Sequence, residues 1–130
     1  NRVAGAEKVF APQERRRASF KPEALEAVRS ALLGVTSEAG GTAHGAATPL
    51  APVAGKTGTA QVIEQKTAGG KLSATTQDHA WFVAYAPAND PKIAVAVVVE
   101  HGGHGGAAAA PVAKKVIEEY LKHAGTKTAR

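Results

Sequence analysis

The chain has 130 residues, a length that suits one ordinary domain and leaves no room for two. Hydrophobic residues make up 44% of it and charged residues 21%, as in globular proteins, and no apolar run approaches the ~20 residues that cross a bilayer. Cysteine is absent, which excludes disulfides and thiolate metal sites, and the charge of +5 does not predict a nucleic-acid partner, because no aromatic residues are interleaved with the dense basic run at 15–17.

The first part of the chain predicts a connector, a helix and a loop. Residues 1–20 show little periodicity and are expected to be irregular. Proline suits the first turn of a helix, and after Pro22 the apolar residues recur at helical spacing. These apolar positions are Leu25, Val28, Leu32 and Val35. We therefore expect a helix over 22–38, ended by the glycines at 40–41, and a loop over 42–52, which is rich in Ala, Gly, Thr and Pro.

The middle of the chain predicts three strands. Residues 53–63 are short, bounded by a proline and a polar segment, and rich in threonine and β-branched residues. Gly55 and Gly58 weaken this strand, so we expect something to approach its backbone closely. Two apolar strands follow over 80–99, and the short turn at 87–91 makes them antiparallel. Their nearly continuous apolar runs predict burial on both faces, under helices.

The end of the chain predicts a second helix. After a glycine-rich segment, an alanine run leads to Pro111, and apolar residues then mark one face of a helix over 111–123. The chain shows no internal repeat and no second composition regime, so residues 1–130 are expected to form one unit. The fold class is α/β, of the α+β type, with helices packed on an antiparallel sheet.

The segment around Lys56-Thr57-Gly58-Thr59 carries the chemistry, and two interpretations compete for it. A phosphate-binding P-loop needs glycine five positions before the Gly-Lys-Thr, where this chain has Leu50. It also needs a helix directly after the motif, whereas the residues here favour a strand. The P-loop interpretation fails on both counts.

The other interpretation is the Lys-Thr-Gly element of penicillin-interacting enzymes, which lies on a strand lining the active site. A cation at Lys56 would attract the terminal carboxylate of a D-Ala-D-Ala peptide, and the hydroxyls of Thr57 and Thr59 could hydrogen-bond it. Gly58 would let the substrate lie along the strand and pair with its backbone. Taken alone, the Lys-Thr-Gly tripeptide is weak evidence for this class of enzyme, because a given sequence of three residues occurs by chance in many proteins.

The surrounding residues strengthen this interpretation. Residues 53–62, 78–87 and 91–103 resemble the C-terminal sheet of class B penicillin-binding proteins, and within them the elongation type, penicillin-binding protein 2. The likeness runs from about residue 22 to 121 and implies the penicillin-binding/β-lactamase-like transpeptidase fold. It implies that Lys56 is the electrostatic partner of the substrate and of the Ser-x-Asn serine. It also implies that the Thr59 amide is the second donor of the oxyanion hole.

The chain departs from the family pattern in its serines. None is followed by Lys at the third position or by Asn at the second; these serines are Ser19, Ser30, Ser37 and Ser73. We therefore expect the nucleophile to lie outside these residues and the chain alone to be inactive. Methionine is absent, including at position 1, which fits a segment of a longer polypeptide, the C-terminal part of a transpeptidase domain.

The resemblance implies a parent enzyme that cross-links cell-wall stem peptides by serine acyl transfer and is trapped by β-lactams. It implies no metal or organic cofactor, an upstream membrane anchor, a catalytic domain in the periplasm or extracytoplasmic space, and partners in the cell-elongation machinery. The alternative is a non-catalytic binding or structural module that retains a transpeptidase-like sheet.

The histidines carry weaker signals than the lysine motif. His101 and His104 with Glu100 imitate a metal site, but flanking glycines would leave such ligands poorly fixed, so we expect an exposed glycine loop instead. His79 follows Asp78 just before a strand, where a local hydrogen bond or a structural cap is expected rather than general-base chemistry.

Overall fold

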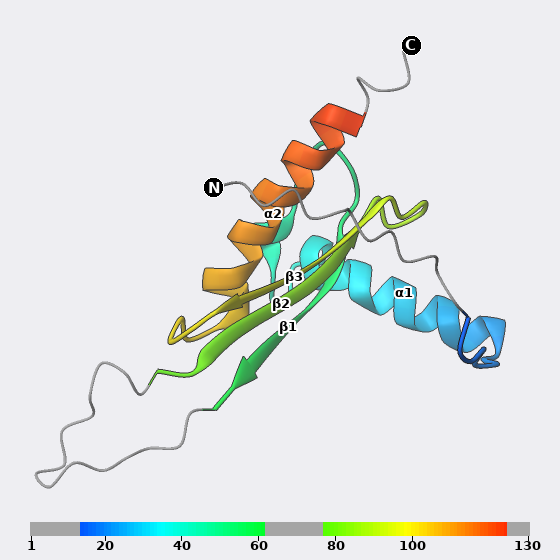
Figure 1. Ribbon diagram of the computed structural model, residues 1–130, viewed down its shortest axis with the longest axis horizontal. Helices are drawn as coiled ribbons and strands as arrows, with labels where there is room; N and C mark the ends of the chain where they lie inside the picture. Colours follow the sequence, from blue (N-terminus) through cyan, green and yellow to red (C-terminus); the bar gives the residue numbers. More distant parts are fainter. Residues whose placement is uncertain (1–13, 62–76, 125–130) are drawn as a thin grey trace, which may run out of the picture.

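The computed structural model describes residues 14–61 and 77–124. Two helices and a three-stranded sheet form the body of the chain (Figure 1). In chain order the elements are α1 (Pro22–Ser37), the 3-10 turn η1 (His44–Ala46), β1 (Ala54–Ala60), β2 (His79–Ala86), β3 (Ile93–Val99) and α2 (Gly105–Ala124). Among these described residues, no helix has the length and apolar character needed to cross a membrane.

The sheet has the order β1-β2-β3, and both pairings are antiparallel. Lys56 lies opposite Val83, and Gly58 lies opposite Trp81. Within the described part of the chain β1 pairs with β2 alone, so its other edge has no strand beside it. The predicted antiparallel sheet with packed helices is confirmed, and the strand that carries the lysine motif lies at an edge.

The core lies between α2 and one face of the sheet. β2 alternates strictly, so that Ala80, Phe82, Ala84 and Ala86 face α2 and are buried. Phe82 and Ile117 are fully buried, and most of the other core residues are alanines. Small side chains let the helix sit close to the strands, so Phe82 fills much of the interior. Truncating such a residue typically costs about 3 to 5 kcal/mol.

The other face of the sheet is largely uncovered in the described chain, contrary to the expectation of burial on both faces. Trp81 and Val83, which point away from α2, are 41% and 47% exposed. α1 does not cross this face, because it packs against β1 and η1 (Figure 1). Apolar content predicted the burial, but only the direction of the helix decides which face is covered.

The end of α1 is fixed to the start of β1 by one buried side chain. The hydroxyl of Thr36 is 2.5 Å from the carbonyl oxygen of Val53, to which it donates, and Thr36 is only 3% exposed. The helix ends at Ser37, where a backbone N–H of the next residue still bonds the carbonyl of Gly34. The bond between Thr36 and Val53 fixes the direction in which the chain enters β1.

The second helix begins at Gly105 rather than at Pro111, so the expected start was wrong. Alanine is the best helix former, and the alanine run before the proline extends the helix toward its N-terminus. Pro111 lies inside the helix, where it forgoes one backbone hydrogen bond. Its ring packs beside Gly45 in η1: a Cβ built on that glycine would lie 3.2 Å from the proline Cγ.

The remaining boundaries follow the expectations where they are described. Residues 14–20 are irregular, and the earlier part of the expected connector lies outside the described residues. β1 is shorter than the expected 53–63, whose last two residues also lie outside them. At the turn after β2, the N–H of Lys92 bonds the carbonyl of Ala86.

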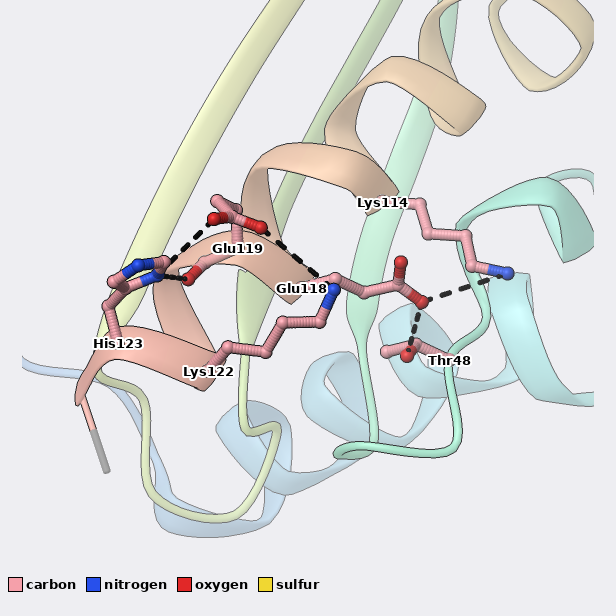
Figure 2. Close-up of polar contacts among 6 residues, drawn as sticks. All are labelled: Thr48, Lys114, Glu118, Glu119, Lys122 and His123. Atoms are coloured by element: carbon pink, nitrogen blue, oxygen red, sulfur yellow. Dashed lines mark hydrogen bonds and ion pairs between the residues drawn. The ribbon is translucent and has the colours of Figure 1, made fainter. Parts of the chain in front are cut away.

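A polar contact ties the loop before β1 to α2. The hydroxyl of Thr48 donates to Glu118 Oε1 over 2.7 Å, and Lys114 Nζ lies 3.9 Å from the same oxygen (Figure 2). One residue further along the helix, the carboxylate of Glu119 turns outward to Lys122 and His123. Glu118 therefore joins two segments that are far apart in sequence, whereas Glu119 makes contacts within its own helix.

Candidate active site

The four motif residues lie side by side on β1, but their side chains point to two faces. Cross-strand partners share a face, so Lys56 and Gly58 belong to the uncovered face with Val83 and Trp81. Thr57 and Thr59 lie opposite Phe82 and Ala80, on the face that α2 covers. The lysine and the two hydroxyls can therefore reach one ligand only from the free edge of the strand.

Lys56 is exposed, and its ammonium folds back along the strand. Nζ donates to the carbonyl oxygen of Thr57 over 2.8 Å. That contact uses one of the three donors of an ammonium and leaves two for another partner. The charge is thus held beside the unpaired edge of β1 rather than extended into solvent.

The Thr57 hydroxyl has a partner that the sequence did not reveal. Its Oγ1 lies 3.0 Å from Oγ1 of Thr42, in the loop before η1, and either hydroxyl can be the donor. A hydroxyl donates one hydrogen bond and accepts two, so Thr57 keeps capacity for a ligand. Thr42 therefore orients Thr57. No motif or spacing marks it, because the contact spans fifteen positions in sequence.

The two glycines of β1 serve different purposes. A Cβ on Gly55 would lie 2.6 Å from the ring of Phe82, so this glycine makes room for the core of its own chain. A Cβ on Gly58 would meet only Cβ of Trp81, at 3.3 Å. The group that approaches Gly55 closely is therefore the ring of Phe82 from the same chain, whereas the surface above Gly58 is open to a ligand.

The N-terminus of α2 packs directly on the motif strand. A Cβ on Gly105 would collide with the carbonyl oxygen of Trp81 and lie 2.8 Å from that of Gly58. A Cβ on Gly106 would collide with the carbonyl oxygen of Thr42. Since helix N-termini carry partial positive charge, this placement adds to the field of Lys56 and favours an anion at the strand.

Together these groups form an anion-binding edge: one cation, two threonine hydroxyls of which Thr42 orients one, and a run of backbone donors and acceptors that is unpaired within the described chain. Such an edge can bind an extended chain by strand addition and hold its carboxylate by charge-assisted hydrogen bonds. A backbone N–H in the same strand can donate to an oxyanion. The serines of the described residues do not join this group: Ser30 and Ser37 belong to α1, and Ser19 lies in the irregular segment before it.

His79 and His101 lie at the end of the sheet where β1 ends and β2 begins. The ring centroids of His101 and His79 are 4.8 Å apart with the ring planes tilted by 59°, and the backbone N–H of His101 donates to Nδ1 of His79. The hydrogen bond expected for His79 is present, but it joins residues 22 positions apart rather than local ones. Within residues 14–61 and 77–124, no three histidine, aspartate or glutamate side chains lie close enough together to hold a metal ion.

The likeness to known proteins is consistent with this geometry. The family model described as penicillin binding protein transpeptidase domain matches residues 3–118. The chain therefore belongs to the family of penicillin-binding protein transpeptidase domains.

Relatives of known structure or name sharpen the assignment. Peptidoglycan D,D-transpeptidase MrdA of Haemophilus influenzae is 44% identical over 108 residues, which are 78% of this chain and 16% of that protein. The solved complex between PBP2 and MreC from Helicobacter pylori superposes with a TM-score of 0.60 at 31% identity, over 75% of this chain and 17% of the other. The ceftriaxone acyl-enzyme of penicillin-binding protein A from Mycobacterium tuberculosis gives a TM-score of 0.64 at 34% identity, over 85% and 24%.

These matches confirm the resemblance to the penicillin-binding protein 2 group. The chain spans less than one fifth of the MrdA relative and about one quarter of the M. tuberculosis structure. Its antiparallel sheet with packed helices matches the transpeptidase fold of these proteins.

Proposed function

We propose that these residues are the C-terminal part of the transpeptidase domain of a peptidoglycan D,D-transpeptidase, and that β1 forms one wall of its active-site cleft. The observation that carries this proposal is the position of Lys56-Thr57-Gly58-Thr59 on an edge strand whose outer side is unpaired within the described chain. A substrate peptide can pair with that edge, and Lys56 is exposed beside it.

The proposed reaction is acyl transfer through a serine that lies outside these 130 residues. The serine oxygen attacks the carbonyl of the penultimate D-alanine, and the bond to the terminal D-alanine breaks as that residue leaves with a proton. An amine of a neighbouring stem peptide then attacks the ester and releases the serine. β-Lactams enter the first step and stop there, in line with the ceftriaxone acyl-enzyme of the M. tuberculosis relative.

Each motif residue has a role in this scheme. Lys56 attracts the terminal carboxylate and supports the serine of the Ser-x-Asn element, while Thr57 and Thr59 hydrogen-bond the carboxylate. The N–H of Thr59 donates to the oxyanion that forms on the attacked carbonyl. Removal of one such donor costs about 3 to 4 kcal/mol in enzymes where it has been measured.

The setting of the parent protein is proposed on the same basis. An upstream anchor would hold it in the inner membrane with this domain outside the cytoplasm, where its peptidoglycan substrate lies. The H. pylori PBP2 was solved with MreC, which supports a partner of that kind in the cell-elongation machinery.

The test is Lys56→Ala in the full-length protein, assayed by the rate of labelling with fluorescent penicillin. Hydrogen bonds to charged groups are worth about 1.5 to 3 kcal/mol, so the acylation rate should fall roughly 10- to 100-fold. Lys92→Ala is the matched control: that lysine is exposed at the turn after β2 and pairs with Asp90. Its acylation rate should not change.

Three outcomes would contradict the proposal. Equal acylation of the Lys56 and Lys92 variants would remove the electrostatic role of Lys56. A full-length protein that no penicillin labels would favour the alternative, a non-catalytic module with a transpeptidase-like sheet. Labelling of this chain by itself would contradict the placement of the nucleophile outside it.

A further inference from the structure

The loop between β3 and α2 is fastened to the beginning of β2 by three hydrogen bonds. The N–H of His101 donates to His79 Nδ1 over 3.0 Å, and the N–H of Gly103 donates to the carbonyl of Asp78 over 2.8 Å. His101 Nδ1 lies 3.1 Å from the carbonyl oxygen of Gln77. His79 supplies the one side-chain acceptor among the three.

The backbone of this loop does not adopt its conformation without support. His101 has φ of +53°, in the left-handed region that residues with a Cβ rarely occupy. Such a conformation is unfavourable for a residue with a Cβ and persists where surrounding contacts determine it. The bond from its own N–H to His79 is one of those contacts.

The hydrogen bonds define where the ring protons lie. Nδ1 of His79 accepts an N–H, so it carries no proton, and the proton of the neutral ring is on Nε2. Nδ1 of His101 faces a carbonyl oxygen, which only accepts, so that nitrogen carries the proton. A protonated His79 would have donors on both nitrogens and could not accept from His101. The bond therefore exists only while His79 is neutral.

The fastened loop is connected to the motif strand by two routes, one through its hydrogen-bond partner His79 and one through Gly105 at its C-terminal end. His79 lies opposite Ala60, the last residue of β1, and the residue after it lies opposite Thr59. At its other end the loop runs into Gly105, which packs against the carbonyl of Gly58. Movement of the loop would therefore displace the backbone of Gly58 and Thr59.

We propose that His79, in its neutral Nε2-protonated form, is a positioning residue that fastens the β3–α2 loop and thereby holds the motif strand in place. Its protonation releases the loop and slows acylation. This inference rests on the proposed function, since it concerns the geometry of the same site. It assigns His79 no contact with substrate.

Few other charged groups surround this ring in the described chain. Asp78 precedes it on its own strand, and the loop contributes His101 with Glu100 and His104. Across the sheet, the end of β1 carries no charge, and Lys56 lies further along the strand on the same face. The first charged residue of α2 is Lys114, which follows Pro111, so the first two turns of α2 carry no charged side chain.

The experiment compares two substitutions in the full-length protein. His79→Asn places an amide oxygen where Nδ1 lies and does not titrate, whereas His79→Leu removes the acceptor. The penicillin acylation rate is measured from pH 5 to 8, the range in which histidine changes charge. We expect the leucine variant to lose about threefold to tenfold at neutral pH, the range of one ordinary hydrogen bond. The asparagine variant should keep the neutral rate.

The pH profile separates positioning from simple packing. The wild-type rate should fall toward pH 5 more steeply than that of His79→Asn. Identical profiles for the two would overturn the role of protonation, and a neutral rate as low in the asparagine as in the leucine variant would overturn the role of the acceptor.

Hydrogen exchange gives a readout that does not depend on activity. The peptide that contains His101 should exchange faster in wild type as the pH falls, after correction for intrinsic rates, and less so in His79→Asn. If the leucine variant does not fold, this measurement still tests the role of His79. Equal exchange in wild type and His79→Asn at every pH would refute the proposal. Absence of labelling in wild type at neutral pH would instead count against the proposed function.

Discussion

The contact between α2 and the motif strand makes Gly105→Ala an informative perturbation. A Cβ at this position would collide with the carbonyl oxygen of Trp81 and lie 2.8 Å from that of Gly58. Both atoms belong to the backbone of paired strands, so neither can rotate away. The helix or the strand has to move.

The magnitude follows from two opposed terms. Overpacking of this kind costs about 1 to 3 kcal/mol, while alanine gains at most ~1 kcal/mol over glycine in a helix and less at its first residue. The cost of the clash should therefore exceed the gain in helix propensity, and the free energy of unfolding should fall by about 1 to 2 kcal/mol. Because the displaced backbone includes Gly58, acylation by penicillin should slow as well.

The assay is the temperature at which the full-length protein loses half of its penicillin labelling, together with the acylation rate at 25 °C. Gly40→Ala is the matched control, because a Cβ there would have nothing within 4 Å. That substitution should stay within ~0.5 kcal/mol of wild type. If Gly105→Ala matched the control in both measurements, the close packing of α2 on β1 would be refuted.

The other predictions concern polar contacts. Thr36→Val leaves the buried carbonyl of Val53 without its donor and should cost about 1 to 3 kcal/mol, while the exposed Ser37→Ala should cost less than ~0.5 kcal/mol. Equal midpoints in chemical unfolding would contradict this. Glu118→Ala breaks the bond to the loop before β1 and should destabilise by about 1 to 2 kcal/mol more than Glu119→Ala, whose contacts are exposed. Equal losses at these two helix positions would mean that the inter-segment contact contributes nothing.

The local elements followed from the sequence because local forces form them. Helical spacing after Pro22, the short turn at 87–91 and the β-branched content of the strands predicted α1 and the antiparallel pair. The start of α2 was misplaced because the periodic apolar residues begin only after Pro111, while the alanines before it extend the helix.

The candidate site was predicted in part. The motif residues were identified from their types and neighbours, and the strand they lie on is the edge strand β1. Nothing in the sequence indicated that Thr42 is the partner of Thr57, because a loop threonine carries no pattern that distinguishes it from other loop threonines. The bond between His79 and His101 was also hidden, since it joins distant segments.

Sequence by itself determined the kinds of element, their order and the chemistry of one strand, since periodicity, turn residues and residue types act over a few positions. Tertiary structure alone decided which face of the sheet α2 covers, that the Thr57 hydroxyl meets Thr42, and that Gly105 abuts the motif backbone. Those features depend on where distant segments meet. Such meetings are set by the packing of the whole core, which no local pattern encodes.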